Sequence, residues 1–293
     1  MTQRPGPFSA VADHVYVSRV PFSAEDGPAE VTVGLVVGTE GAVLVDCGAT
    51  PQQGRWLEDA IAEVTPLPLV GVVLTHWHYD HSFGLLGLSA PLSIAHESVG
   101  ERLGSPAARA EADRLGVDPA TILRPNREVA VATAVDLGGG VRVEAVHLGR
   151  GHTDGDLVVV VPGSDVVFAG DLVESSGPPA YGPDSYAHEW PATLDGLIGL
   201  TTDTSVILPG HGEALDREAI FEQRGRVAAV SGEIARLAGL AVQVEDAEER
   251  GTWALPFAAV RPGLPVAFSQ MRAADPQPAQ VGVVGPQRQL PLA

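Results

Sequence analysis

Short runs of apolar and β-branched residues dominate the first third of the chain. Residues 14–20, 31–37 and 42–46 are three such runs, separated by turn-forming residues, and this pattern predicts strands. Residues 54–64, "GRWLEDAIAEV", repeat apolar positions at helical spacing, which predicts an amphipathic helix. Residues 69–75, "LVGVVLT", form a continuous apolar run that is typical of a strand buried on both faces.

The rest of the chain continues to alternate between the two patterns. The predicted elements are helices at 97–115 (interrupted at Pro106), 190–200 and 213–240, and strands at 141–148, 157–161, 165–170 and 205–210. The turn residues at 162–165 predict a hairpin between two of these strands. This order predicts an α/β protein of two similar halves, with two sheets covered by helices.

We expect one large domain over residues 1–240 and a C-terminal extension over residues 241–293 that packs on it. The tail from about Arg272 is rich in Pro, Gln and Gly and has no periodicity. We therefore expect roughly the last 20 residues to be extended or disordered.

Composition and charge narrow the classes of partner. Hydrophobic residues make up 45% and charged residues 19% of the 293 positions, as in soluble globular proteins. The formal charge of −19 disfavours nucleic acid and anionic lipid as partners, although a bound cation can neutralise acids locally. The N-terminal sequence does not resemble a signal peptide, and no apolar stretch approaches the roughly 20 residues that cross a bilayer. We expect a soluble, cytoplasmic protein that acts on a small molecule; the sequence does not indicate its oligomeric state.

The segment "HWHYDH", residues 76–81, holds three of the nine histidines. His76 and His78 are two positions apart, so in an extended loop both imidazoles point the same way and can bind one ion. Asp80 and His81 project at other angles and can serve a neighbouring ion. The plain alternative is a solvated polar loop, which the density of ligand-type side chains disfavours.

Three further residues of ligand type follow predicted strands. His152 lies in "GRGHTDGD", Asp171 ends "FAGD", and His211 lies in "LPGHG". Rigid scaffolds expose their chemistry where a strand ends and a loop begins. Taken singly, each residue could instead cap the next helix or turn.

The order of these motifs, "HWHYDH", "GHTDGD", "AGD" and "PGHG", resembles the metallo-β-lactamase-fold hydrolase superfamily. Asp46 in "VLVDCG" also matches the first motif of that superfamily. The resemblance covers residues 46–211. It implies a four-layer αββα sandwich with a metal site at one edge, between the two sheets.

Matched residue by residue, the resemblance implies two divalent metal ions, with zinc as the expected metal and iron or manganese as alternatives. One ion would be held by His76, His78 and His152, and the other by Asp80, His81 and His211, with Asp171 bridging both. Asp46 would orient the ligand loop from outside the ligand set. Asp80 and Asp171 are the residues to which we assign catalytic roles, and a metal-bridging hydroxide would be the nucleophile.

The implied activity is hydrolysis of a small-molecule ester, thioester, lactone or lactam. Asp171 stands where true β-lactamases commonly have Cys or another residue that is not Asp. This difference favours branches similar to glyoxalase II and the lactonases. The sequence "SFG" after the histidine motif, however, differs from the Gly-Gly that is usual in glyoxalase II.

Candidate substrate contacts are aromatic or imidazole side chains near these motifs. Residues 174–190 form a long, turn-rich segment after Asp171 that could act as a lid or as an ordinary surface loop. The candidates are Trp77, Tyr79, Tyr181, Tyr186 and His188.

Two alternative functions use the same ligands. The first is an iron-dependent oxidoreductase of the persulfide-dioxygenase or flavodiiron type, although no flavin-binding segment follows residue 240. The second is a non-catalytic, metal-stabilised binding protein, which would be expected to lack one of the ligands.

Overall fold

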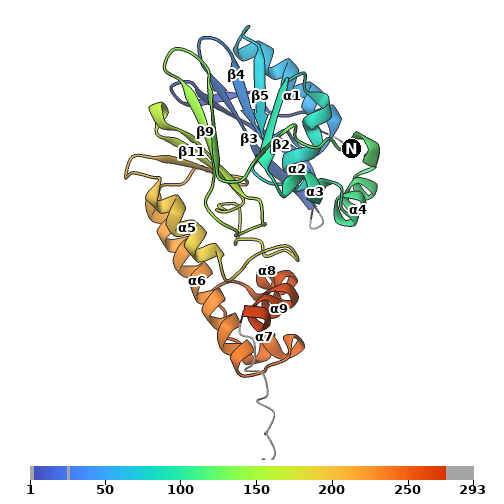
Figure 1. Ribbon diagram of the computed structural model, residues 1–293, viewed down its shortest axis with the longest axis vertical. Helices are drawn as coiled ribbons and strands as arrows, with labels where there is room; N and C mark the ends of the chain where they lie inside the picture. Colours follow the sequence, from blue (N-terminus) through green and yellow to red (C-terminus); the bar gives the residue numbers. More distant parts are fainter. Residues whose placement is uncertain (1–2, 25–26, 275–293) are drawn as a thin grey trace, which may run out of the picture.

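The computed structural model describes residues 3–24 and 27–274, whose strands form two sheets that face each other (Figure 1). One sheet has seven strands and the other has five. Helices cover the outer face of each sheet. The α/β class predicted from the sequence is therefore confirmed.

The seven-stranded sheet follows the order of the chain, from β1 to β7. Strands β1 to β4 pair antiparallel, whereas β4 to β7 pair parallel, because helices connect the parallel strands. The strands are β1 (Ser9–Ala12), β2 (Val15–Ala24), β3 (Gly27–Val37), β4 (Ala42–Val45), β5 (Leu69–Val73), β6 (Leu92–His96) and β7 (Arg127–Val129).

The five-stranded sheet has the order β12-β11-β10-β9-β8. Strands β8 to β11 form an antiparallel meander, and β12 pairs parallel with β11. The predicted hairpin is present, since Val161 of β10 pairs with Val166 of β11. The strands are β8 (Ala132–Asp136), β9 (Arg142–His147), β10 (Leu157–Val161), β11 (Val166–Gly170) and β12 (Val206–Pro209).

Alternate residues of the central strands pack into different layers of the core. In β4, Val43 and Val45 face the other sheet, whereas Leu44 faces the helices. In β11, Phe168 faces the first sheet and Val167 faces the helices of the second. Strands buried on both faces in this way produce four layers, as the apolar runs of the sequence predicted.

Helices α1 to α4 lie along the outer face of the seven-stranded sheet (Figure 1). Thr50 caps α1 because its side chain accepts a hydrogen bond from the Gln53 amide at 3.2 Å. The helices are α1 (Pro51–Val64), α2 (Tyr79–Ser82), α3 (Val99–Leu103) and α4 (Pro106–Leu115), with 3₁₀ turns η1 (Phe83–Gly87) after α2 and η2 (Pro119–Thr121) after α4. As predicted, Pro106 begins a new helix.

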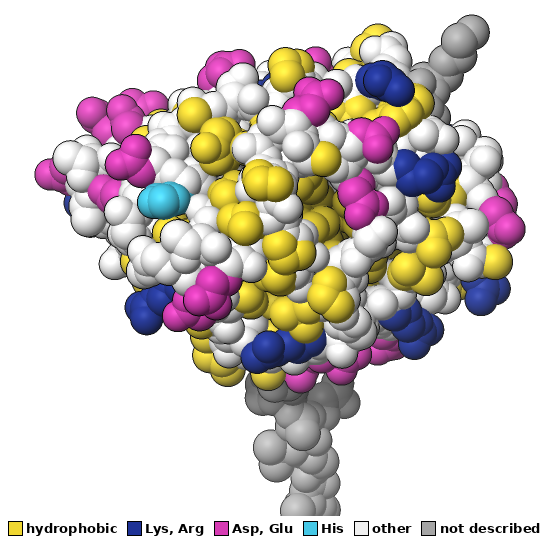
Figure 2. Space-filling model, turned by 90° about the horizontal axis from the view of Figure 1, so that it is seen from above, with side chains coloured by type: hydrophobic (Ala, Val, Ile, Leu, Met, Phe, Trp, Pro, Cys, Tyr) yellow, Lys and Arg dark blue, Asp and Glu magenta, His cyan; other side chains and the backbone are white. Residues whose placement is uncertain are grey.

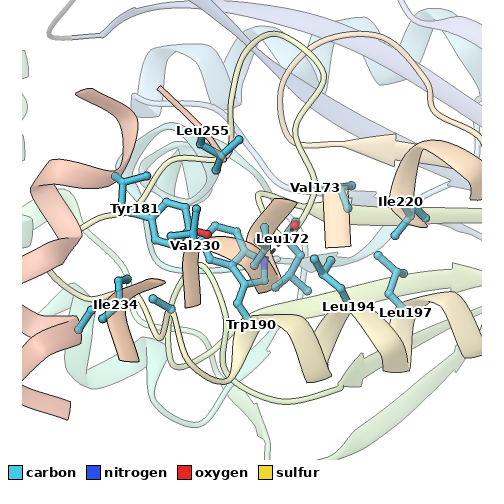
Figure 3. Packing of buried hydrophobic residues seen from close by; sticks show 14 of the residues in the cluster. Leu172, Val173, Tyr181, Trp190, Leu194, Leu197, Ile220, Val230, Ile234 and Leu255 are labelled. Carbon is cyan, nitrogen blue, oxygen red and sulfur yellow. Dashed lines mark hydrogen bonds between the residues drawn. The ribbon is translucent and has the colours of Figure 1, made fainter. Parts of the chain in front are cut away.

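Helices α5 (Trp190–Gly199) and α6 (Arg217–Gly239) cover the five-stranded sheet, and the helices that follow them extend this layer. Trp190 is fully buried at its centre and donates a hydrogen bond from Nε1 to the Leu172 carbonyl oxygen at 3.1 Å (Figure 3). Leu194 and Leu197 of α5 pack beside it.

Residues 241–274 pack against the same helices. The helices are α7 (Ala247–Arg250), α8 (Phe257–Val260) and α9 (Leu264–Ala274), and the 3₁₀ turns η4 (Val244–Asp246) and η5 (Arg261–Gly263) lie beside them. A further 3₁₀ turn, η3 (Pro162–Ser164), connects β10 to β11. Val260, Leu264 and Phe268 join the core of α5 and α6. The expected extended or disordered end of the chain falls almost entirely on residues 275–293, outside the described residues.

Several elements were not predicted from the sequence: β1, β6, β7, β8, the short helices α7 and α8, and helix α9. Strand β8 alternates between exposed and half-buried positions and so lacks a clear apolar run. Strand β7 has only three residues. Such short elements form because neighbouring strands and helices pair with them.

Charged side chains lie on the surface of the molecule. Figure 2 shows one end of it, where acidic and basic side chains lie around the periphery and apolar side chains lie nearer the middle. None of the described helices combines the length and the apolar character that crossing a membrane requires.

Glycines bring α1 and η1 into direct backbone contact. A Cβ on Gly54 of α1 would lie 2.0 Å from the Gly84 carbonyl oxygen, and a Cβ on Gly87 would lie 2.2 Å from the Pro51 carbonyl oxygen. Both distances are far shorter than atoms tolerate. Because η1 directly continues α2, this contact fixes the segment that carries Asp80 and His81.

We predict that Gly54→Ala lowers the free energy of unfolding by about 1–3 kcal/mol, because the added methyl group forces α1 away from η1. Gly225→Ala is the matched control, since a Cβ at this position of α6 meets nothing within 4 Å. The control should raise the free energy of unfolding by roughly 0.5–1 kcal/mol. Urea denaturation measures both variants, and equal stability of the two would contradict the close contact.

Candidate metal centre

The predicted ligands gather at one edge of the two sheets. His76 and His78 follow β5, and Asp80 and His81 lie in α2 directly after them. The other three follow strands of the second sheet: His152 lies in the loop from β9 to β10, Asp171 follows β11 and His211 follows β12. Strand ends far apart in the sequence thus bring seven side chains together.

The first group contains His76, His78, His152 and Asp171, whose ligand-type atoms all lie within 4.8 Å of one another. His78 Nδ1 lies 3.0 Å from His76 Nε2 and 2.9 Å from His152 Nε2. Three imidazole nitrogens and a carboxylate at this spacing form a set that could hold a divalent metal ion.

The second group contains Asp80, His81 and His211. Asp80 Oδ2 lies 3.4 Å from His81 Nε2 and 3.3 Å from His211 Nε2. Asp171 contacts this group as well, because its Oδ1 lies 3.3 Å from His81 Nε2 and its Oδ2 lies 3.3 Å from His211 Nε2. The same Oδ2 lies 3.5 Å from His152 Nε2 of the first group. Asp171 therefore lies between the two groups, where the sequence predicts a bridging ligand.

Two atoms of this cluster test whether metal ions fit the site. His81 Nε2 and Asp171 Oδ1 are buried and have no hydrogen-bond partner among the described residues. A buried polar atom without a partner costs about 1–3 kcal/mol, so native structures rarely retain one. Both atoms face the space between the ligands, and imidazole nitrogen and carboxylate oxygen are donors that zinc accepts. The residues fit the metal ions that the sequence implies.

Asp46 holds the ligand segment from behind. Its Oδ2 accepts a hydrogen bond from His81 Nδ1 at 2.8 Å, and its two oxygens accept hydrogen bonds from the Thr75 amide at 2.7 Å and the Thr75 hydroxyl at 2.9 Å. The backbone φ of Asp46 is 62°, a left-handed conformation that is unfavourable for a residue with a side chain. The carboxylate thus aims His81 Nε2 into the site from outside the ligand set. The resemblance implied this location for Asp46.

Asp184 orients His78 as Asp46 orients His81, and the sequence did not indicate this role. Its Oδ2 accepts a hydrogen bond from His78 Nε2 at 3.2 Å and another from Trp77 Nε1 at 2.7 Å. His78 Nδ1 therefore faces the other ligands. The only signal in the sequence was an acidic residue inside the turn-rich segment 174–190, which does not specify a contact with residue 78.

Other elements orient the remaining imidazoles. His152 Nδ1 donates a hydrogen bond to the Ala180 carbonyl oxygen at 3.1 Å, and His211 Nδ1 donates one to the Glu30 carbonyl oxygen at 2.8 Å. His76 Nδ1 lies 3.1 Å from the Thr75 hydroxyl oxygen. In each case the second ring nitrogen points into the cluster, so a backbone carbonyl or, for His76, the Thr75 hydroxyl selects which nitrogen can bind a cation.

Burial and charge shift the pKa values of the cluster in opposite directions. Burial lowers the pKa of His152 to about 4, so its imidazole is neutral and ready to bind a cation. Burial also acts to lower the pKa of His81, but the carboxylates of Asp171 and Asp80 outweigh it and raise the pKa well above its usual value. His81 therefore holds a proton that a metal ion has to displace.

A cavity of about 570 Å³ opens onto the cluster. Its wall includes His78, Asp80, His152, Asp171 and His211, and most of the other lining residues are apolar. The volume falls within the range of small-molecule sites. The cavity thus joins the candidate ligands to a space in which a substrate can lie.

The five proposed substrate contacts do not all face this cavity. Trp77, Tyr79 and Tyr181 line it, whereas Tyr186 and His188 do not belong to its described lining. Tyr186 lies under the Arg150 guanidinium at 4.3 Å, and His188 Nδ1 lies 3.4 Å from the hydroxyl oxygen of Ser231 on α6. Tyr186 and His188 thus lie against Arg150 and Ser231, and their contact with a substrate stays a prediction.

Tyr181 lies where the cavity meets the hydrophobic core. Only 2% of the residue is exposed, and its ring packs against Trp190 with ring centroids 4.9 Å apart. The ring points into the core beside Val230, as Figure 3 shows. Tyr181 thus borders the cavity while its ring packs in the core against Trp190.

The chain belongs to the metallo-beta-lactamase superfamily, whose family model matches residues 26–211. The metallo-beta-lactamase type 2 of Bacillus cereus is 28% identical over 200 residues, which cover 67% of this chain and 72% of that protein. The metallo-beta-lactamase type 2 of Bacteroides fragilis is 23% identical over 184 residues, which cover 61% and 68%. The chain is accordingly a metal-dependent hydrolase of this superfamily.

Solved structures confirm the αββα fold. A metallo-beta-lactamase from Pontibacter korlensis superposes with a TM-score of 0.63 at 21% identity and covers 75% of this chain and 98% of its own. FIM-1 from Pseudomonas aeruginosa, in its mono-zinc form, superposes with a TM-score of 0.61 at 19% identity and covers 78% and 96%.

We predict that Asp184→Ala lowers the affinity for one metal ion by about 10–100-fold, because His78 loses the carboxylate that orients its ring. Competition with a chromophoric chelator measures the affinity. Asp195→Ala is the control: Asp195 pairs with Arg224 at 2.7 Å on the helical surface, away from the cluster. The role of Asp184 is wrong if both variants bind metal as the parent protein does.

Binding of Zn²⁺ to the metal-free protein at pH 7 should release at least about one proton per chain, because an imidazolium cannot be a ligand and the pKa of His81 is raised. Lower pH leaves more protons for the metal ion to displace, so metal affinity falls as pH falls. Calorimetry in buffers of different ionisation enthalpy counts the protons. Binding without proton release at pH 7 would contradict the raised pKa.

Proposed function

We propose that this enzyme is a dinuclear hydrolase that binds two divalent ions, with zinc as the expected metal. Its substrate would be a small-molecule ester, thioester, lactone or lactam. One observation carries the proposal: the carboxylate of Asp171 contacts histidines of both ligand groups, with Oδ1 3.3 Å from His81 Nε2 and Oδ2 3.5 Å from His152 Nε2. A carboxylate shared in this way suits a pair of neighbouring ions better than a single ion.

Bound divalent ions supply Lewis acidity, which lowers the pKa of a water molecule and polarises the oxygen of a substrate carbonyl. The side chains of this chain hold the reacting groups in place. Asp80 and Asp171 border the cavity directly, so we assign them the catalytic roles. Trp77 and Tyr79 form part of its wall and keep bulk water from the reacting groups.

The proposal includes a nearer relationship to glyoxalase II and the lactonases than to true β-lactamases. Its support is Asp171, which stands at a position where true β-lactamases commonly have another residue. The relatives described above are metallo-beta-lactamases by name, so lactam hydrolysis belongs in the same substrate panel.

Purified protein loaded with zinc should contain about two ions per chain. Asp171→Ala should lose at least one of these ions, and its rate of hydrolysis should fall by about a thousandfold or more. Mass spectrometry of the metal content and a panel of ester, thioester, lactone and lactam substrates measure the two effects. Asp203→Ala is the control, because 92% of the Asp203 side chain is exposed.

Three results would contradict the proposal in different ways. Full activity of the metal-free protein would exclude a metal-dependent mechanism. Bound iron with visible absorbance and oxygen consumption would point to the oxidoreductase alternative. Two bound ions with no turnover of any substrate in the panel would favour a binding protein.

A further inference from the structure

The walls of the cavity away from the metal ligands are mostly apolar. Phe22 and Ala24 come from the end of β2, Ala107 from α4, and Ala180 and Pro183 from the segment before α5. Phe22 and Tyr79 pack edge to face with ring centroids 5.8 Å apart. These walls can bury an apolar group of a substrate, which stabilises the complex by roughly 25 cal/mol for each Å² removed from water.

Arg102 is the one lysine or arginine in the described lining of this cavity, and the sequence contains no lysine. An arginine here would normally bind the carboxylate of a substrate, because its guanidinium matches a carboxylate in geometry. In this structure the guanidinium of Arg102 is already bound to the carboxylate of Asp154. Arg102 Nε lies 3.2 Å and 3.1 Å from the two carboxylate oxygens of Asp154, and its terminal nitrogen lies 2.5 Å from one of them.

The pair is partly shielded from water, with 33% of the Arg102 side chain and 19% of the Asp154 side chain exposed. It also joins α3 to the loop that carries His152. Glu111, which lines the cavity, is itself paired with Arg114 at 2.8 Å. The cavity wall therefore offers a substrate no unpaired cation among its described residues.

The metal centre does not supply a net positive charge either. Two divalent ions, as proposed above, would bring four positive charges. Four carboxylates lie within or directly behind the ligand set and balance them: Asp46, Asp80, Asp171 and Asp184. The chain as a whole carries a formal charge of −19, which repels anions at long range.

We propose that the substrate carries an uncharged, apolar acyl group, and that Asp154 enforces this choice by holding Arg102 away from substrate carboxylates. The proposal rests on the proposed hydrolase function and narrows its substrates to neutral esters, thioesters and lactones. In the reaction, water oxygen bonds to the acyl carbon, the bond to the alcohol or thiol breaks, and the leaving group takes a proton. The acid product ionises, and a cavity without a free cation releases it.

The test uses two esters with the same leaving group and the same six-carbon acyl length. They are 4-nitrophenyl hexanoate and the mono-4-nitrophenyl ester of adipic acid, which ends in a carboxylate. With the zinc-loaded enzyme, and after correction for spontaneous hydrolysis, kcat/KM should favour the hexanoate by about tenfold or more, because the carboxylate would be buried without a partner. Added salt should raise kcat/KM for the anionic ester by screening repulsion.

Asp154→Asn should reduce this preference about tenfold, mainly through a lower KM for the adipate ester, because Arg102 becomes free to bind its carboxylate. Adding Arg102→Gln should restore the original ratio. Asp195→Asn is the matched control, since it releases Arg224 from a similar bidentate pair with distances of 2.8 Å and 2.7 Å outside the cavity. The control should leave the ratio unchanged.

A binding measurement keeps this inference separate from the proposed hydrolysis. Hexanamide and adipamic acid match the two acyl groups, and saturation-transfer NMR measures their binding to the zinc-loaded protein. Stronger binding of hexanamide supports the inference even if neither ester is cleaved. Failure to cleave either ester would count against the proposed hydrolase function and not against this inference. Equal or stronger binding of adipamic acid, or an unchanged ester ratio in Asp154→Asn, overturns the inference.

Discussion

The carboxylate of Asp171 lies between the two ligand groups, and the surrounding backbone has to leave room for it. A Cβ on Gly210 would lie 1.9 Å from Asp171 Oδ1, so a side chain at that position would occupy the place of the carboxylate. Gly170, with φ of +53°, turns the chain out of β11 directly before Asp171, and a Cβ there would lie 2.9 Å from Thr75. Bare backbone on both sides of Asp171 therefore lets the ends of the two sheets approach closely enough to share one carboxylate.

The orientation of each imidazole depends on an element other than the one that carries it. Strand β3 contributes the Glu30 carbonyl oxygen to His211, and the segment before α5 contributes Asp184 to His78. Asp46, at the end of β4, fixes His81. The cluster thus requires both sheets and the long connection between β11 and α5 in their final places, which explains why a four-layer scaffold supports a site of only seven side chains.

The ligands could be predicted from the sequence because their signals are local. Each lies within a few residues of a strong apolar run, and four of them lie within six positions of one another. Asp184 could not be predicted, since its partner His78 is 106 positions away and nothing near residue 184 specifies that contact. The same reason applies to the orientation of Tyr181 and His188. Packing against α5 and α6 determines which way these side chains point, and sequence spacing does not predict that packing.

Residues 148–156, between β9 and β10, couple metal geometry to substrate charge. The loop brings His152 within 2.9 Å of His78, and two positions later Asp154 holds Arg102. Asp156 fixes the turn by accepting hydrogen bonds from the Thr153 amide at 2.9 Å and the Thr153 hydroxyl at 2.6 Å. Any shift of this backbone would move the metal ligand and the ion pair together. A change confined to the Asp154 side chain leaves the contacts of Asp156 intact, so the charge that a substrate meets can vary while the metal ligands stay in place.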